Sequence, residues 1–208
     1  MTDHPIIFSA PMILALLAGR KTMTRRIRWT GKKAADDQGF RESPWARVKP
    51  DARLWVREGL ALGATSNAWK YRADDTLISM TWPDHRVAQM VAWAHHQERE
   101  TIPSIYMPRW ASRLTLVVTA TKIERLQDIS AIDAIAEGLV RVPLEDRLDV
   151  QYRWQPYPCS SSYPDPIEAF AMLWTAVHDA EAWRSNPEIV ALSFEVHKQN
   201  IDSMKEAA

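Results

Sequence analysis

Cysteine and glycine are scarce in this chain of 208 residues, and no long apolar run is present. The single cysteine, Cys159, excludes an intramolecular disulfide and a cysteine-rich zinc site, and it predicts a reducing compartment. The six glycines form no G-x-G motif, which excludes a glycine-rich phosphate loop. The apolar N-terminal run, residues 6–18, is interrupted by Ser9 and Pro11 and is too short to span a bilayer. We therefore expect a cytoplasmic protein with no membrane partner.

Net charge is also absent, because 26 Lys and Arg side chains balance 26 Asp and Glu side chains. The balance is uneven along the chain. Residues 1–60 hold 12 basic and 6 acidic side chains, whereas residues 121–208 hold 8 basic and 15 acidic ones. Seven basic residues and no acidic one lie in residues 20–33. A local basic patch of this kind can contact RNA phosphates even in a neutral protein.

The apolar content of 46% is enough for a packed core and too high for a disordered chain. Strand and helix patterns are widely separated and lack regular βαβ alternation, which argues against a doubly wound sheet. We predict an α+β fold in one domain over residues 1–208, a small mixed β-barrel with packed helices. The expected strands are 5–8, 22–27, 53–58, 112–123 and 188–197. The expected helices are 10–18, 83–97, 131–137 and 165–178, with insertions at 29–50, 61–100 and 143–165.

The segment with the richest chemistry is residues 18–26, in which a lysine precedes two threonines and two arginines. If residues 22–26 are extended, Thr22, Thr24 and Arg26 share one face. Lys21 in a partly apolar pocket beside other cations can lose its proton near neutral pH and then accept the proton of a threonine hydroxyl. The alternative is a basic strand on a solvated face, with threonines that reflect β propensity.

Familiar metal and hydrolase motifs are missing, because the sequence contains neither H-E-x-x-H nor G-x-S-x-G. His95 and His96 are adjacent, so on a helix their side chains diverge by about 100°. We interpret the six histidines as exposed helix and loop residues, and we expect no metal and no cofactor.

Residues 17–26 (L-A-G-R-K-T-M-T-R-R) closely resemble the opening signature of ASCH-domain proteins, a branch of the PUA-like superfamily. Residues 103–113 (P-S-I-Y-M-P-R-W-A-S-R) resemble a segment typical of the longer ASCH proteins, which phages and prophages often encode. The resemblance extends from about residue 6 to residue 197. It departs at residues 50–52, where the family usually has Gly-Asp. Weaker similarity lies in residues 53–58, 128–139, 170–174 and the last strand.

The resemblance implies a PUA-like β-barrel with helices packed at its ends and a cleft beside the first helix. It also implies two functional classes. Many ASCH proteins are thought to bind RNA, whereas some small bacterial members are amidohydrolases that remove the acyl group from N4-acetylcytidine with a Lys, a Thr and a Glu. By position in the matching motifs, those residues are Lys21, Thr24 and Glu137.

In such a site Lys21 takes the proton of Thr24, the Thr24 Oγ attacks the exocyclic amide carbonyl, and water hydrolyses the acyl-enzyme. Glu137 would hydrogen-bond the cytosine amino edge or pass a proton to the leaving amine. Arg20, Arg26 or a backbone N–H would stabilise the oxyanion. The alternatives remain open: Lys21 and Glu137 as a structural ion pair, and the whole protein as a non-catalytic module that binds RNA or a modified nucleobase.

Arginines and tryptophans next to one another suit a surface that stacks bases and meets phosphates. Trp29 and Trp110 each adjoin basic residues and are the candidates for stacking, with cation–π packing as the alternative. We expect Arg26 to contact substrate or to pair with Glu58, and Arg25 to face outward. A nuclease ranks lower, because the sequence has no cluster of metal-binding carboxylates.

Overall fold

The chain divides into two compact units, each described here by itself. Unit 1 comprises Met1, Ala15–Ala52 and Val117–Val196, and unit 2 comprises Thr2–Leu14, Arg53–Leu116 and His197–Ala208. The prediction of a single domain with insertions stays a prediction. The computed structural model describes residues 3–30, 41–62, 69–78, 100–143, 152–157 and 159–204.

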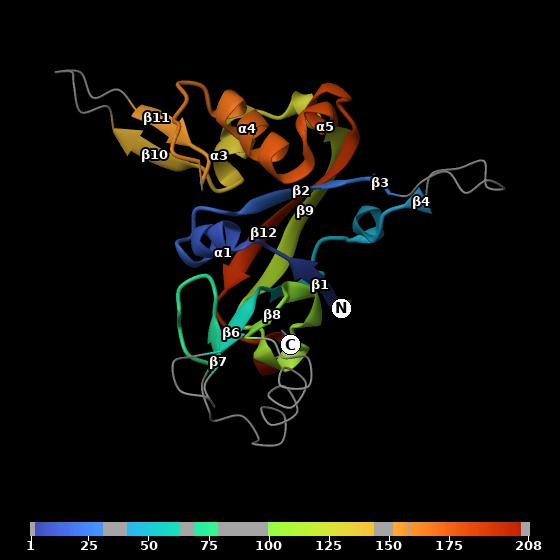
Figure 1. Ribbon diagram of the computed structural model, residues 1–208. Helices are drawn as coiled ribbons and strands as arrows, with labels where there is room; N and C mark the ends of the chain where they lie inside the picture. Colours follow the sequence, from blue (N-terminus) through green and yellow to red (C-terminus); the bar gives the residue numbers. More distant parts are fainter. Residues whose placement is uncertain are drawn as a thin grey trace. The chain divides into compact units, whose positions relative to one another are not determined.

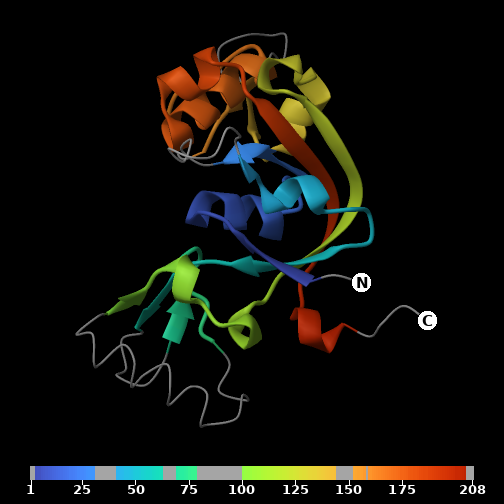
Figure 2. The ribbon, with the colours of Figure 1, turned by 90° about the vertical axis from the view of Figure 1, so that its right-hand side faces the viewer.

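The sheet of unit 1 is built on long strands that the apolar alternation predicts well. Strand β12 (Glu188–His197) lies between β9 (Thr115–Arg125) and β2 (Met23–Ile27), and Figures 1 and 2 show β9 and β12 as long curved strands side by side. β12 and β2 are antiparallel, with Leu192 opposite Thr24 and Ala191 opposite Arg25. β2 is an edge strand of this sheet.

Three helices gather at one end of unit 1: α3 (Ala131–Ala136), α4 (Pro166–His178) and α5 (Ala180–Arg184) (Figure 1). The first two begin at the predicted N-caps. The Ser130 hydroxyl accepts a hydrogen bond from the Asp133 N–H at 3.1 Å, and the Asp165 carboxylate accepts one from the Ile167 N–H at 2.9 Å. Helix α4 buries its apolar face through Ala169, Phe170, Leu173 and Trp174.

Two predicted loops of unit 1 contain regular structure. Short strands β3 (Trp29–Thr30) and β4 (Arg41–Glu42) pair within the expected 29–50 loop, and the 3₁₀ helix η1 (Pro44–Arg47) follows. Strands β10 (Val140–Pro143) and β11 (Tyr152–Gln155) form an antiparallel pair where a proline-rich loop is expected. Pro143 is tolerated as the last residue of β10, because β10 pairs with β11 alone among the described strands and no second ladder needs the missing N–H. The 3₁₀ helix η4 (Leu126–Asp128) links β9 to α3.

Unit 2 contains the parallel pair β1 (Asp3–Ile7) and β5 (Arg53–Arg57), with β5 next to the start of β9. Leu54 and Val56 are buried on one face of β5, as the alternation predicts. Helix α1 (Ala10–Leu17) begins in this unit and ends in unit 1. A second small sheet has the order β7-β6-β8. Its strands are β6 (Leu60–Leu62), β7 (Trp69–Tyr71) and β8 (Thr101–Ile102), with 3₁₀ helices η2 (Ser104–Tyr106), η3 (Arg109–Ala111) and η5 (Ile201–Ser203).

The mixed α+β class is therefore confirmed, but the closed β-barrel that the sequence predicts is not found in the described part of the chain. The larger sheet has two edge strands, β1 and β2, so its ends do not meet. A small number of strands, far apart in sequence, is compatible with an open sheet and with a barrel, and the residue pattern does not distinguish the two. The helix expected at 83–97 lies outside the described residues. No helix of the described residues is long and apolar enough to cross a membrane.

Candidate functional site

The candidate site lies in unit 1, where the end of α1 meets the end of α3. Gly19 has a φ of +72° and ends α1, because glycine adopts this left-handed conformation without strain. The chain then runs beside Glu137, with which Lys21 forms an isolated antiparallel bridge. The Thr22 N–H donates to the Ala136 carbonyl at 2.9 Å. The backbone thus holds Lys21 in register with the C-terminus of α3.

Lys21 and Glu137 form a buried ion pair. The Lys21 Nζ donates to the Glu137 Oε2 at 2.6 Å and to the Glu137 carbonyl oxygen at 2.9 Å. Only 2% of Lys21 and 4% of Glu137 is exposed, so the pair is shielded from water. The 2.6 Å separation is short enough for a proton to pass between the two groups.

Arg25 completes the charge cluster, although the sequence predicts that it faces outward. Its Nη1 donates to the Glu137 Oε1 at 3.2 Å, and its Nη2 donates to Glu124 at 2.9 Å and to Asp133 at 3.1 Å. Its side chain has no exposed area, and the guanidinium carbon lies 5.8 Å from the centre of the Phe170 ring. A buried arginine needs several carboxylate partners to offset its desolvation, and α3 and β9 supply them.

Burial lowers the pKa of the Lys21 ammonium below its ordinary value. Glu137 opposes this shift, whereas the positive charges of Arg26 and Arg25 add to it. Burial likewise lowers the pKa of the Arg26 guanidinium, and Glu137 opposes that shift too. The net shift for Lys21 is downward, which is the direction that a lysine general base requires.

Thr24 lies three residues after Lys21 on β2, and only 2% of the residue is exposed. The neighbouring Thr22 is exposed, so the two threonines of the motif have different surroundings.

Gly138 lets α1 and Lys21 approach α3 closely. Its φ is +104°, and a Cβ atom built at this position would lie 3.0 Å from the Ala15 Cβ and 3.2 Å from the Lys21 Cβ. Any side chain here would therefore clash with two neighbours and strain the backbone. The Glu-Gly sequence at the end of α3 thus has a steric reason as well as a chemical one.

Of the other predicted substrate-binding residues, Arg26 acts electrostatically on Lys21 and is itself acted on by Glu137. Arg20 is exposed. The Arg26 guanidinium lies 5.8 Å from the centre of the Trp45 ring, and it lowers the pKa of His178, for which burial is the larger cause. Trp110 is half-buried in unit 2, against the apolar cluster of Leu60, Trp69, Tyr71, Ile78, Ile102, Met107 and Ala111. The side chain of Trp29 lies outside the part of the structure that is described.

The expected Arg26–Glu58 pair is replaced by another. Both carboxylate oxygens of Glu58 accept hydrogen bonds from Arg113, at 2.8 and 2.9 Å. Sequence reasoning missed Arg25, Glu124 and Asp133 as members of the cluster. Alternation places residues 21, 23 and 25 of an extended segment on one side, and this signal pairs Arg25 with Lys21.

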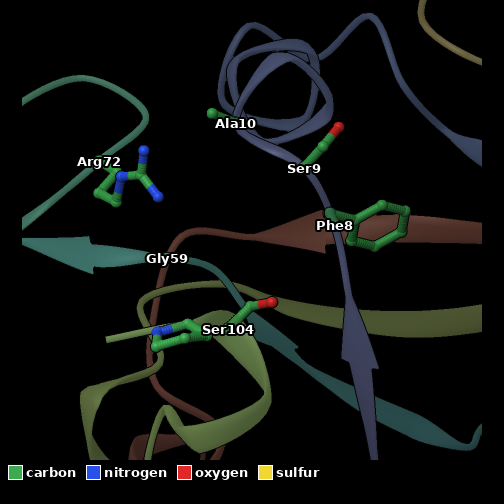
Figure 3. Close-up of a pocket in the computed structure, with 7 residues that line it drawn as sticks. Phe8, Ser9, Ala10, Gly59, Arg72 and Ser104 are labelled. Atoms are coloured by element: carbon green, nitrogen blue, oxygen red, sulfur yellow. The ribbon is translucent and has the colours of Figure 1, made fainter. Parts of the chain in front are cut away.

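A cavity of about 420 Å³ lies in unit 2 (Figure 3). The segment leading into α1, the residue before β6, the residue after β7 and the start of η2 line it. None of its lining residues is a buried polar side chain, so the cavity by itself identifies no ligand. The lining residues are Phe8, Ser9, Ala10, Gly59, Arg72, Pro103 and Ser104.

No protein-family model, no curated protein and no solved structure matches the chain. Within the described residues, no group of three or more His, Cys, Asp or Glu side chains could hold a metal ion.

Proposed function

We propose that unit 1 carries an amidohydrolase site of the ASCH, PUA-like type, which removes the acyl group from N4-acylated cytosine nucleosides such as N4-acetylcytidine. The observation that carries this proposal is a buried threonine three residues from a buried lysine, which shares the Glu137 carboxylate with Arg25. The resemblance of residues 17–26 and 128–139 to ASCH proteins supplies the substrate class.

The reaction begins with deprotonated Lys21, which accepts the proton of the Thr24 hydroxyl. The Thr24 Oγ attacks the carbonyl carbon of the N4-acyl group and forms a tetrahedral oxyanion. The C–N bond then breaks, the amine of cytosine leaves with a proton, and an acyl-threonine ester remains. Water hydrolyses the ester to a free carboxylic acid and restores the Thr24 hydroxyl.

Proton movement in this scheme uses the contact between Lys21 and Glu137. The Glu137 Oε2 lies 2.6 Å from the Lys21 Nζ and is positioned to receive the proton that Lys21 gives up. Protonated Glu137 then donates to the leaving amine. The depressed pKa of Lys21, caused first by burial, supports this direction of transfer. Arg26 and Arg20 are the proposed cations for the oxyanion and the substrate.

A non-catalytic module that binds RNA or a modified nucleobase is the second candidate. The observation that favours it is the ion pairing of the cluster, in which Lys21 and Arg25 contact both oxygens of Glu137. An ion-pair network of this kind stabilises a fold without turning over a substrate. The exposed Arg20 and the Arg26–Trp45 contact suit phosphate and base binding.

Purified protein incubated with N4-acetylcytidine separates the two candidates. We expect the wild type to release cytidine and acetate, and Lys21→Ala and Thr24→Ala each to lower kcat/KM by at least about a thousandfold. Thr22→Ala is the matched control, because it removes an exposed hydroxyl two residues away, and we expect activity within about twofold of wild type.

Failure of the wild type to hydrolyse any N4-acyl cytosine, together with RNA binding that weakens with salt, would replace the hydrolase by the binding module. Full activity in Thr24→Ala would exclude threonine as the nucleophile.

A further inference from the structure

Arg25 is a fully buried charge of unit 1, and nothing in the proposed chemistry uses it. It lies on β2 opposite Ala191 of β12, and its side chain has no exposed area. Its guanidinium reaches three carboxylates: Glu137 at 3.2 Å, Glu124 at 2.9 Å and Asp133 at 3.1 Å. These belong to the end of α3, to β9 and to α3 itself, so Arg25 links two elements to β2.

The two oxygens of Glu137 are divided between two cations. Oε1 accepts from the Arg25 Nη1, and Oε2 accepts from the Lys21 Nζ. A carboxylate held by one contact can rotate about its last side-chain torsion, which is broad. The Arg25 contact removes this freedom and points Oε2 at Lys21.

We propose that Arg25 is the positioning residue of this site: it holds Glu137 through Oε1 so that Oε2 stays in proton-transfer distance of the Lys21 Nζ. The inference rests on the proposed hydrolase. Arginine suits the task because its planar fork spans several carboxylates and because it stays protonated at every relevant pH. It therefore does not compete with Lys21 as a base.

The same geometry gives Arg25 an electrostatic effect on Lys21. Removing Arg25 takes away a like charge and leaves Glu137 to attract the Lys21 proton alone, so the pKa of Lys21 rises.

Other charged groups surround Lys21 and Arg25. Arg26 acts on Lys21 from β2, and Asp133 faces Arg25 from α3. Glu124 and Lys122 face Arg25 from β9, where the Lys122 Nζ lies 2.5 Å from the second oxygen of Glu124. His178 on α4 faces Arg26.

The test compares Arg25→Gln, Arg25→Lys and Asp133→Asn in the full chain, with N4-acetylcytidine as substrate. We expect Arg25→Gln to lower kcat by about ten- to a hundredfold with KM within about twofold, because misplacement of a reacting group costs this much. The acid limb of kcat/KM should move to higher pH by about one unit, because the base must lose its proton. Arg25→Lys keeps the charge but cannot span the carboxylates. In this variant the acid limb of kcat/KM should lie at the wild-type pH, whereas kcat should recover only in part.

Asp133→Asn is the matched control, because it removes one partner of Arg25 and leaves the Arg25–Glu137 contact in place. We expect its kcat within about twofold of wild type. An equal loss of kcat in Asp133→Asn and Arg25→Gln would overturn the proposal, as would wild-type kcat and an unchanged acid limb in folded Arg25→Gln. If Arg25→Gln does not fold, Arg25→Lys decides: wild-type kcat in that variant overturns the positioning role.

A second readout keeps this inference separate from the hydrolase itself. NMR titration of the Lys21 side chain, assigned with Lys21→Ala, needs no turnover. We expect its pKa to be higher in Arg25→Gln than in wild type and near the wild-type value in Arg25→Lys. Absence of turnover in the wild type defeats the proposed function. An unchanged Lys21 pKa in Arg25→Gln defeats the role of Arg25.

Discussion

Each compact unit buries glutamate against arginine, yet the arrangements around Glu58 and Glu137 differ. In unit 2, Glu58 is 2% exposed and both its oxygens accept from Arg113, which also donates to Asp74 at 2.8 Å. In unit 1, Glu137 is as deeply buried, but Arg25 takes one oxygen and Lys21 takes the other. The first glutamate is paired with a permanent cation alone, and the second has a partner that can lose its proton.

The difference shows that burial and ion pairing do not by themselves mark a reactive site. The Arg113 guanidinium also lies 3.9 Å from the centre of the Tyr71 ring, and burial raises the pKa of Tyr71 to about 12. Burial also raises the pKa of Glu58, and the hydrogen bonds from Arg113 oppose that shift, so this cluster is an ion-pair network that stabilises a fold. In the proposed mechanism, a lysine with a lowered pKa, three residues before a buried threonine, gives the cluster of unit 1 a group that exchanges a proton.

The largest expected contrast is in activity after neutralising each glutamate. Glu137→Gln should lower kcat/KM for N4-acetylcytidine by about a hundred- to ten-thousandfold, because it removes the group that relays the proton. Glu58→Gln should leave kcat of the folded protein unchanged, since Glu58 belongs to the structural cluster. Steady-state kinetics on both variants checks the contrast, and equal losses would mean that the two clusters do not differ in role.

For the free energy of unfolding, we expect the larger loss in the cluster of unit 2 and the smaller loss in the cluster of unit 1. Arg113→Met leaves Glu58 buried without its bidentate partner, which costs about 3–5 kcal/mol in the free energy of unfolding. Lys21→Met leaves Glu137 with Arg25, so its cost should be smaller. Urea unfolding of both variants measures the difference. A larger loss in Lys21→Met would show that the Lys21–Glu137 pair is chiefly structural.

Two glycines of unit 1, Gly138 and Gly19, should differ in how much stability an alanine substitution costs. Gly138→Ala should lower the free energy of unfolding by about 1–3 kcal/mol, because its φ of +104° and its close contacts with Ala15 and Lys21 both oppose a side chain. Gly19→Ala is the control: its φ is +72°, but a Cβ there would meet no atom within 4 Å, so its cost should be about 1 kcal/mol. Thermal unfolding of the two variants tests the order, and equal costs would remove the steric argument at Gly138.

The smallest expected effect is a change in acid sensitivity in unit 2. Burial raises the pKa of Asp74, but hydrogen bonds from Arg113 and Thr76 lower it more, and the net pKa lies below the ordinary value of 3.8. The folded state therefore gains stability from ionised Asp74 above pH 3.8 and loses it as the pH falls through the lower folded pKa.

Asp74→Asn should reduce the loss of unfolding free energy between pH 5 and pH 2, as urea titrations at each pH would show. An acid dependence identical to that of the wild type would mean that the Arg113–Asp74 contact adds nothing to the folded state.

Local signals predicted several elements closely. Alternating apolar residues predicted 188–197, the bounds of β12, and the capping residues Ser130 and Asp165 predicted the starts of α3 and α4. The residue pattern did not predict the short strand pair β10–β11. Prolines and polar residues have low strand propensity, and the pairing depends on a separate segment of the chain. Alternation predicted the extended run 22–27 but not that Arg25 is buried, since its carboxylate partners are about 100 residues away or more.

The sequence by itself determined the motif around Lys21, the spacing of Lys21 and Thr24, and the glycine that follows Glu137. These are local properties, set by helix capping, backbone conformation and residue order. Only the tertiary structure decided which carboxylates surround Lys21 and Arg25, because contacts between β2, β9 and α3 depend on how distant segments pack. Burial in that packing lowers the pKa of Lys21 and shields Thr24 from solvent, and no stretch of residues encodes either effect alone.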